Sequence, residues 1–369
     1  MFKNSFRRLG YSKGRSFGST STDSLSHPKV IFSGIQPTGI PHIGNYLGAL
    51  QNWVQMQDAA RPQDSVIFSV VGWHALTLPQ DPKALLQSKN DMFATLIAIG
   101  LDPEKSIIFH QDDNQDHVEL AWLLNCIAPF GKLRRMTTWK SRLAVSRNAN
   151  DESEVDESIL NTGLFTYPVL QAADILAYKT THVPVGDDQQ QHIELCRDLA
   201  EVFNRMTNSS LFIPPECVIT VSKRILSLKD ASAKMSKSAV DPNSRILLTD
   251  STSLIQKKIR SAVTDSITGI TYDPINRPGT SNLLTILSGC IGEDIHLVAE
   301  QHKTKTHGEL KKVVFEAVEE TLKGPRAEFE RLRMDQGYLE KLSKKGAEKA
   351  RKLSSQTLKE VRRLVGLSH

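Results

Sequence analysis

The feature that most constrains the fold is a short apolar segment that leads straight into a glycine-rich loop. Residues 29–33 (KVIFS) have the length and composition of a buried strand, and the loop occupies residues 34–45 (GIQPTGIPHIGN). Two further strand-like runs occupy residues 65–71 and 106–110. Segments of helical periodicity occupy residues 44–58 and 83–101, between the strands. Alternating strands and helices predict an α/β fold with a doubly wound parallel sheet, which binds ligands beyond the carboxyl ends of its strands.

The C-terminal third is predicted to be helical. Helical periodicity occupies residues 253–262, 283–288, 310–322 and 327–365. We expect three parts in the chain: a leader or arm at residues 1–27, the α/β domain with a helical insertion at residues 28–240, and a helical domain with basic C-terminal helices at residues 241–369. An acidic stretch at residues 150–158 interrupts the insertion and is expected to form a surface loop.

Composition excludes several classes of protein. None of the apolar runs approaches the roughly 20 residues that a membrane-spanning helix needs, so we expect that the protein is not an integral membrane protein. The four cysteines are scattered without a CxxC pair, which favours reduced thiols over a zinc site or a disulfide framework. The net charge of +5 permits a polyanionic partner. From Lys341 onward the chain has nine Lys or Arg residues and two Glu residues, a pattern typical of a solvated helix face or of contact with a nucleic-acid backbone.

The N-terminus has the composition of a targeting segment. The first 22 residues contain five Lys or Arg residues and several Ser and Thr, and the first acidic residue is Asp23. This pattern, which lacks the apolar block of a secretory signal, predicts a mitochondrial presequence that is cleaved before Pro28 and directs the protein to the matrix. The alternative is a basic arm that helps to hold RNA.

Two widely separated loops carry groups suited to phosphates. The glycines of the first loop allow a phosphate to approach closely, and Gly44-Asn45 begins a helix whose free N–H groups attract an anion. The second loop, residues 234–238 (KMSKS), offers two flexible ammonium groups that can neutralise the charge on departing pyrophosphate. Together and in this order, QPTGIPHIGN at residues 36–45 and KMSKS resemble the HIGH-type and KMSKS loops of class I aminoacyl-tRNA synthetases, in the tryptophanyl/tyrosyl branch.

This resemblance implies that ATP binds between the two loops, with Mg²⁺ held by its phosphates and no dedicated protein metal site. It implies catalytic roles, through charge stabilisation, for His42, Asn45, Lys234 and Lys237. The implied ATP-binding residues are Gln36, His42, Ile43, Gly44, Asn45, Gly186, Asp187, Asp188, Ile225, Lys234, Met235, Ser236, Lys237 and Ser238. The GDDQ stretch at residues 186–189 differs from the family's GEDQ motif because Asp187 replaces Glu, and helix capping is an alternative role for its two aspartates.

The segment between the loops points to the amino acid. Residues 167–176 (YPVLQAADIL) are similar to the stretch of tryptophanyl-tRNA synthetases in which an aspartate, here Asp174, accepts the indole N–H. Indole can only donate, so a pocket that recognises it needs an acceptor, although a buried Asp is often a purely structural acceptor. Gly72 stands where the family usually has Asp, so that carboxylate is missing. The other residues expected in the tryptophan site are Gln36, Gln189, Phe32 and His74.

The resemblance implies a two-step reaction. Tryptophan and ATP would give tryptophanyl-adenylate and pyrophosphate, and the tryptophanyl group would then pass to the terminal 2′-hydroxyl of tRNA(Trp) with release of AMP. It further implies a Rossmann-like catalytic domain, a C-terminal helical domain that binds the anticodon, a homodimer, and a role in mitochondrial translation. Three alternatives stay open: a tyrosyl-tRNA synthetase, a small-molecule nucleotidyltransferase with a HIGH-like loop, and an inactive RNA-binding relative.

Overall fold

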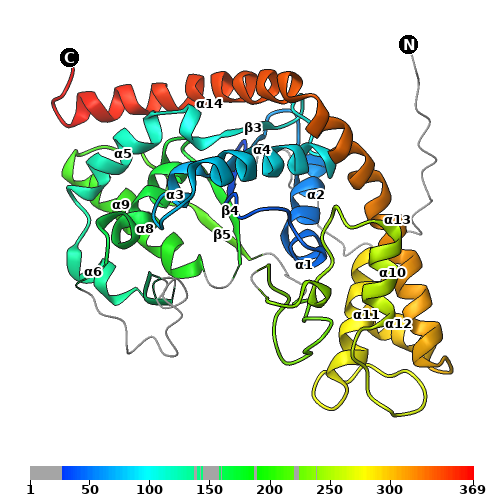
Figure 1. Cartoon of the computed structure of the whole chain (residues 1–369). Helices are drawn as coiled ribbons and strands as arrows, with labels where there is room; N and C mark the ends of the chain where they lie inside the picture. Colours follow the sequence, from blue (N-terminus) through cyan, green and yellow to red (C-terminus); the bar gives the residue numbers. More distant parts are fainter. Residues whose placement is uncertain are drawn as a thin grey trace.

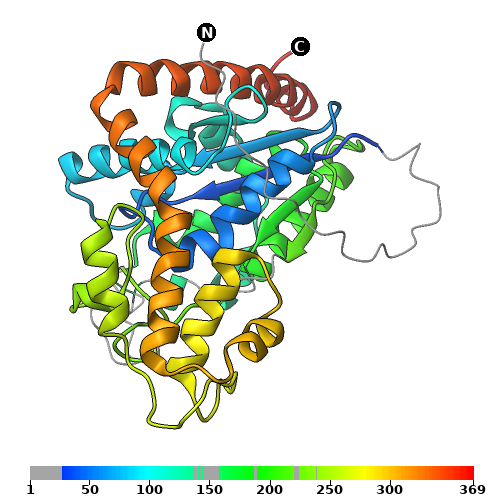
Figure 2. The ribbon, with the colours of Figure 1, turned by 90° about the vertical axis from the view of Figure 1, so that its right-hand side faces the viewer.

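The computed structural model describes residues 27–136, 139–141, 143, 158, 160–186, 189–219, 224–237 and 239–369. Its central element is a five-stranded parallel sheet with the strand order β3-β2-β1-β4-β5 (Figures 1 and 2). The strands are β1 (Val30–Ile35), β2 (Ser65–Val70), β3 (Ile107–His110), β4 (His182–Val185) and β5 (Glu216–Ile219). The doubly wound parallel sheet predicted from the sequence is therefore confirmed, and the three expected strands coincide with β1, β2 and β3.

The position of β1 in the sheet creates the ligand-binding edge. β1 pairs with β2 along its whole length on one side and with β4 on the other, at Ile31 and His182. The chain reverses the direction of its crossovers between β1 and β4, so the connections that leave these two strands run to opposite faces. A crevice opens at such a switch point, beyond the carboxyl ends of the strands.

The helices between the strands cover both faces of the sheet. One long helical segment after β1 consists of α1 (Ile43–Asn45), the π-helical η1 (Tyr46–Leu50) and α2 (Gln51–Ala59). The others in this part are α3 (Gly72–Ala75), α4 (Pro82–Ala98), the 3₁₀ turn η2 (Gln111–Asp113), α5 (Asp116–Asn125), α6 (Phe130–Arg135), α8 (Thr162–Leu176) and α9 (Gln190–Met206). Alternate side chains of β2 point to the two faces: Val66 and Phe68 pack with α2 and α4, whereas Ile67 packs with α5, α8 and α9.

The C-terminal region is helical, as expected. Its elements are the 3₁₀ turn η6 (Pro242–Ser244), α10 (Thr252–Arg260), α11 (Pro278–Ile291), α12 (Ile295–His302), α13 (His307–Met334) and α14 (Gln336–Leu364). Helices α10–α13 pack together below the sheet in the view of Figure 1, and α13 leads back up to it. Among the described residues, none of the helices combines the length and the apolarity that crossing a membrane requires.

Helix α14 leaves α10–α12 and lies along the edge strand β3 (Figures 1 and 2). Gly346 permits this close approach, because a Cβ atom at this position would lie 1.9 Å from the carbonyl oxygen of Ile108. Ala347, Ala350 and Val361 extend the contact into the same core as α5 and α8. A helix that covers an edge strand also protects its unpaired backbone groups.

One predicted boundary is wrong. The periodicity of the sequence predicts that one helix ends at residue 322 and the next begins at 327, on either side of Gly324-Pro325. In the structure, α13 continues through Pro325 to Met334. A proline removes a single backbone hydrogen bond, and the buried face of α13, including Phe329 and Leu332, outweighs that loss. The helix ends instead at Asp335, whose carboxylate accepts from the backbone N–H of Tyr338 at 3.0 Å and caps α14.

Candidate active site

A cavity of about 290 Å³ lies at the switch point between β1 and β4. Its walls come from the end of β1 (Phe32 to Gln36), from β4 and the following Gly186, from η1, α2, α3 and α8, and from Gln189, which precedes α9. The lining is mostly apolar, and a few polar groups converge on it, which is the usual composition of a small-molecule site. The sheet therefore places a cavity at the edge where the sequence predicted ligand binding.

Asp174 is the acidic group among the described residues that line this cavity. It lies on α8, is 2% exposed, and accepts three hydrogen bonds from side chains. The Nε2 atom of His74 lies 2.8 Å from Oδ2, whereas Gln111 Nε2 and His117 Nδ1 lie 2.6 and 2.7 Å from Oδ1. A carboxylate can accept about four hydrogen bonds, so one acceptor position remains for a donor that enters the cavity.

The protonation of this cluster follows from its geometry. Burial opposes ionisation of Asp174, but the hydrogen bonds from His117 and His74 outweigh it and hold the pKa of Asp174 at about 2. An ionised carboxylate only accepts, so His74 carries its proton on Nε2 and His117 carries one on Nδ1. The cavity therefore presents a fixed negative acceptor, as recognition of an indole N–H requires.

The other residues predicted for the tryptophan site meet at the same cavity. Phe32, Gln36, His74 and Gln189 all line it, together with Gly186 from the predicted ATP set. The sequence analysis missed three further polar residues at or next to the cavity: Gln111 and His117, which support Asp174, and Gln171, which lines the wall and accepts from His192 at 2.7 Å. The sequence does not indicate that Gln111 and His117 lie near Asp174, because they follow β3 in the chain whereas Asp174 lies on α8.

The glycine loop ends in a capped helix. The Nδ1 atom of His42 accepts the backbone N–H of Asn45 at 3.2 Å, and Asn45 Oδ1 accepts the N–H of His42 at 3.1 Å. Burial, with help from Lys237 and Lys234, lowers the pKa of His42 to about 4, so the ring is neutral at pH 7. Since Nδ1 acts as an acceptor, the proton of the neutral ring is on Nε2. His42 can therefore donate a hydrogen bond to an anion without itself carrying charge.

The lysine loop reaches the glycine loop directly. Lys237 Nζ donates to the carbonyl oxygen of Gly39 at 2.8 Å and to Thr38 Oγ1 at 3.1 Å. Burial lowers the pKa of Lys237 to about 8. The ammonium group is thus held against the first loop by neutral acceptors, which an incoming phosphate can replace.

The other described residues of the lysine loop differ in their exposure to solvent. Lys234 is exposed, while Met235 is 2% exposed and packs in the core beside Ile225. The Met235 N–H donates to the Ile225 carbonyl oxygen at 3.0 Å, so this pair fixes the base of the loop. Ser236 is half-buried next to it. Three predicted site residues, Asp187, Asp188 and Ser238, lie outside the described residues, as do residues 1–26 and most of the expected acidic loop.

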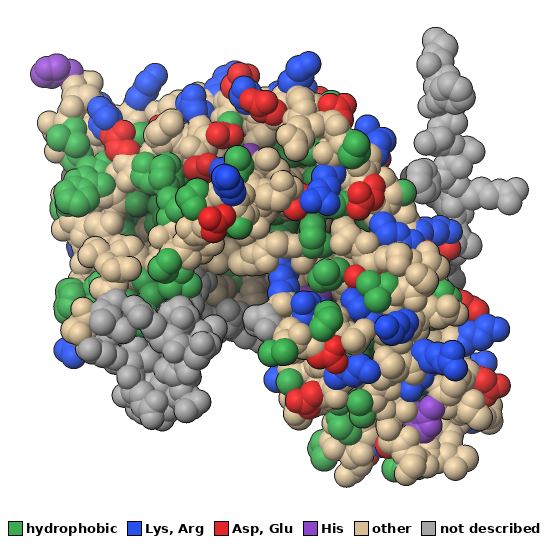
Figure 3. Space-filling view, viewed as in Figure 1, with side chains coloured by type: hydrophobic (Ala, Val, Ile, Leu, Met, Phe, Trp, Pro, Cys, Tyr) green, Lys and Arg blue, Asp and Glu red, His purple; other side chains and the backbone are tan. Residues whose placement is uncertain are grey.

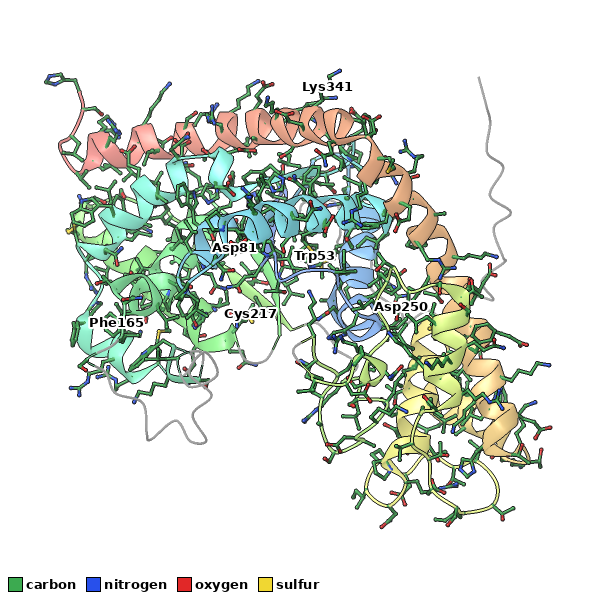
Figure 4. The ribbon with its side chains drawn as sticks, in the orientation of Figure 1. Trp53, Asp81, Phe165, Cys217, Asp250 and Lys341 are labelled. Carbon is green, nitrogen blue, oxygen red and sulfur yellow. The ribbon has the colours of Figure 1, made fainter. Side chains whose placement is uncertain are left out.

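A segment after the lysine loop supports the glycine loop, and the sequence analysis missed it. The N–H of Ile43 donates to the carbonyl oxygen of Ile246 at 2.8 Å, and Arg245 adds a third cation that acts on His42. The segment is anchored at Asp250, which pairs with the buried Lys258 on α10 at 2.5 Å (Figure 4 labels Asp250). No short motif marks these residues, so only the fold could reveal them.

The space that Gly72 leaves is occupied by another carboxylate. A Cβ atom at Gly72 would lie 2.1 Å from Oδ1 of Asp112 on η2. The second oxygen of Asp112 pairs with Lys89 on α4. The carboxylate of Asp112, which follows β3, thus lies next to position 72, where the family usually has an Asp.

Comparison with known proteins agrees with this geometry. The model of the tRNA synthetase class I (W and Y) family matches residues 25–323. The chain is 44% identical to the mitochondrial tryptophan–tRNA ligase of Schizosaccharomyces pombe, over 94% of this chain and 98% of that protein. It is 42% identical to the mitochondrial tryptophan–tRNA ligase of Saccharomyces cerevisiae, over 94% and 93% of the two chains.

A solved structure extends the likeness to three dimensions. Tryptophanyl-tRNA synthetase from Mycoplasma pneumoniae superimposes with a TM-score of 0.78 at 32% identity, over 93% of this chain and 99% of that one. The family model and these relatives cover the sheet, the cavity and both loops. The chain belongs to the class I tRNA synthetases of the tryptophan and tyrosine family.

Proposed function

We propose that this protein ligates L-tryptophan to tRNA(Trp) in mitochondrial translation, with ATP as the energy source. The single observation that supports this choice best is the ionised Asp174 at the apolar switch-point cavity, with one acceptor position left for an indole N–H. Curated relatives at 42–44% identity are mitochondrial tryptophan–tRNA ligases, which supports both the amino acid and the compartment. The mitochondrial matrix is the compartment in which this reaction would serve translation.

In the first step, a carboxylate oxygen of tryptophan attacks the α-phosphorus of ATP. A new P–O bond forms, the bond to the β-phosphate bridge breaks, and pyrophosphate leaves with the electron pair. Lys237 and Lys234 neutralise the charge that grows on pyrophosphate, and His42 donates from Nε2 to a phosphate oxygen. The Asn45 side chain closes the cap that orients His42. These residues position and stabilise charge, so none has to act as a nucleophile.

The other predicted ATP contacts remain part of the proposal. Gly44 permits close approach, because a Cβ atom there would lie 3.0 Å from the His42 ring and 3.2 Å from Ile225. The described side chains around the glycine loop are cations and neutral donors, which suit phosphate oxygens rather than a metal ion. We therefore propose that Mg²⁺ enters the site on the phosphates of ATP. In the second step the terminal 2′-hydroxyl of tRNA attacks the carbonyl carbon, and AMP leaves.

The outer face of α14 supports a role in holding the tRNA backbone. Lys341, Lys352, Lys359 and Arg363 are exposed and, among the described residues, have no ion-pair partner. Their spacings of 11, 7 and 4 residues are close to whole helical turns, so they form one stripe about 33 Å long. Figure 4 shows Lys341 pointing away from the sheet, and Figure 3 shows basic side chains along α14. Lys345, in contrast, pairs with Glu104.

This stripe has a direct test. Replacing Lys352 and Lys359 by Ala should weaken tRNA binding and lower the slope of log affinity against log salt by about 0.9 for each phosphate that is no longer neutralised. Lys345→Ala removes a cation that is already paired and serves as the matched control. An unchanged salt slope in the double variant would remove α14 from the tRNA interface. We also propose that residues 28–240, which contain the cavity and both loops, catalyse the reaction and that the helical region after residue 241 receives the anticodon.

An exposed apolar face supports a homodimer. Val118 and Trp122 project from one face of α5, and Phe130 on α6 is 67% exposed and packs on Phe165. Figure 3 shows apolar side chains gathered over these helices, on the left of the view. Contiguous exposed apolar groups of this kind mark interfaces. We expect Trp122→Glu to convert a dimer into a monomer in analytical ultracentrifugation, and a monomeric unsubstituted protein would contradict the proposal.

The proposed reaction is tested by pyrophosphate exchange with each of the twenty amino acids, followed by charging of tRNA(Trp). Exchange should depend on tryptophan and be absent with tyrosine. Exchange with tyrosine would establish the tyrosyl alternative. Adenylate formation without tRNA charging would establish a small-molecule nucleotidyltransferase, and the absence of any adenylate would establish an inactive relative.

A further inference from the structure

A continuous chain of buried polar side chains connects the cavity to helix α14. It starts at Asp174, whose Oδ1 lies 2.7 Å from His117 Nδ1. His117 Nε2 lies 2.7 Å from the hydroxyl of Tyr178, which lies 3.2 Å from Asn114 Nδ2. Asn114 Nδ2 lies 2.9 Å from Ser354 Oγ on α14. All five side chains are at most 5% exposed, so water does not complete these bonds.

The ionised carboxylate fixes the direction of the first bonds. Asp174 can only accept, so His117 donates from Nδ1. In the neutral form of His117 the opposite nitrogen, Nε2, is an acceptor, and the hydroxyl of Tyr178, 2.7 Å away, donates to it. Burial raises the pKa of Tyr178 well above its usual value, which keeps this donor protonated. Tyr178 therefore reinforces the tautomer of His117 that donates to Asp174.

The same direction continues to α14. Because the Tyr178 proton is used, its oxygen accepts one N–H of Asn114. The second N–H of that amide points to Ser354 Oγ, and the Ser354 hydroxyl donates to Asp116 at 2.5 Å. The Ser354 hydroxyl also lies 3.4 Å from the carbonyl oxygen of Arg351, so its bond to Asp116 is the shorter of the two. A network that is satisfied in this way holds its members in a single arrangement.

Tyr178 also contacts the wall of the cavity. Its ring stacks on Phe32, with centroids 5.5 Å apart and planes at 15°. Phe32 lines the cavity where the proposed indole would lie. Loss of the tyrosine hydroxyl and loss of its ring should therefore have different consequences, which makes the hydroxyl separately testable.

We propose that Tyr178, Asn114 and Ser354 are positioning residues for tryptophan recognition, and that α14 is part of the amino-acid site through them. They hold His117 in the tautomer that donates to Asp174, and so leave one acceptor position of Asp174 directed at the indole N–H. The inference rests on the proposed function, because it needs Asp174 to recognise tryptophan. None of the three touches the reacting atoms.

The test compares tryptophan with 3-(1-benzothiophen-3-yl)alanine, in which sulfur replaces the indole N–H. In Tyr178→Phe, which keeps the ring that stacks on Phe32, the KM for tryptophan in pyrophosphate exchange should rise about tenfold. The KM for the sulfur analogue and the KM for ATP should stay within about twofold, because the analogue offers no N–H to the acceptor. A network that only stabilises the fold would raise both amino-acid KM values together, and that result would overturn the proposal.

A second pair of variants tests the connection to α14. Ser354→Ala should raise the KM for tryptophan about threefold, without changing the KM for the analogue, since it acts through two more hydrogen bonds. Ser355→Ala makes the same chemical change at the next position of α14, outside the network, and should change neither value. If Ser354→Ala and Ser355→Ala behave alike, α14 does not contribute to recognition.

The unsubstituted protein separates this inference from the proposed function. If it does not activate tryptophan, the proposed function fails. If it activates tryptophan and the sulfur analogue equally well, Asp174 does not recognise the indole N–H, and the positioning role fails while the proposed function stands. If it discriminates between them and Tyr178→Phe discriminates to the same extent, the proposed function stands and the positioning role fails.

Discussion

The switch-point cavity and the glycine and lysine loops hold their charged groups in different ways. Asp174 is 2% exposed and accepts from three side chains on three different elements, each of which is itself buried. Lys237 is half-buried and donates to the hydroxyl of Thr38 and the carbonyl oxygen of Gly39 in the neighbouring glycine loop. The first group cannot move without breaking a network, whereas the second can exchange its partners for a phosphate.

This difference matches two chemical tasks. Discrimination between amino acids needs a fixed acceptor, since a site that can rearrange can also satisfy the wrong substrate. Stabilisation of departing pyrophosphate needs a cation that follows charge as it develops, so its best contacts belong to the transition state. Burial opposes the charged form in both regions: hydrogen bonds from His117 and His74 outweigh it and keep Asp174 charged, whereas Lys237 pairs with no carboxylate among the residues that the structure describes, and its pKa falls to about 8.

The largest effect expected from this comparison is on Lys237. Lys237→Ala should lower kcat for pyrophosphate exchange by about 100- to 1,000-fold, the usual cost of removing one group that stabilises transition-state charge. The KM for tryptophan should change less than about twofold, because the cavity is built from other elements. Lys229→Ala is the matched control, since that lysine donates instead to the carbonyl oxygen of Ser261. Equal losses in kcat and in tryptophan binding would show that the two regions are not separate.

Asp174→Ala tests the other region. Without the carboxylate, the donors of His74, Gln111 and His117 are left buried and unpaired, so the free energy of unfolding should fall by about 3 kcal/mol. The KM for tryptophan should rise about 100-fold while the KM for ATP is retained. Thermal unfolding and steady-state exchange measure the two effects. Glu201→Ala, an exposed carboxylate on α9, controls for the loss of charge; unchanged tryptophan kinetics in Asp174→Ala would remove indole recognition from this residue.

The pH dependence of kcat/KM for ATP should report on the lysine loop alone, because the titrating group, Lys237, lies outside the cavity. The pKa of Lys237 is about 8, so its charge is present below that pH and is lost as the pH rises through it. We expect kcat/KM for ATP to fall by up to about tenfold per pH unit above pH 8. His42 has a pKa of about 4 and stays neutral throughout this range. Lys237→Arg keeps its charge and should abolish the fall, whatever activity it retains; an identical alkaline limb in that variant would assign the titration to another group.

The sequence could predict the groups that lie in contiguous motifs, because their spacing reflects one loop. β1 with its glycine loop, the KMSKS loop and the Asp174 segment are of this kind, and each is found at the switch point or beside it. It could not predict the supports, since His117, Arg245 and Ser354 approach the site from distant elements. Basic residues near the C-terminus show the same limit, because periodicity predicts a helix but not that Gly346 lets it dock against β3.

The breaker at Gly324-Pro325 illustrates a competition that sequence rules cannot decide. Local propensity favours a break there, and the buried face of α13 favours continuation, which wins because Phe329 and Leu332 remain in the core. The actual break at Asp335 turns the chain towards β3. The break thus sets the course of α14 along β3, where Ser354 bonds to Asn114.

The smallest expected effect concerns the contact between Gly72, at the start of α3, and the carboxylate of Asp112. Gly72→Ala should destabilise the fold by about 1 kcal/mol, because the new Cβ displaces the Asp112 carboxylate from Lys89. The double variant Gly72→Ala/Asp112→Ala should be no less stable than Asp112→Ala alone, because the obstacle is gone. Chemical denaturation of the four proteins measures this coupling, and tryptophan KM measured in parallel shows whether the displacement reaches Trp73 and His74. Additive losses would mean that Asp112 moves freely, and the rigidity we ascribe to the amino-acid region would then end at the network around Asp174.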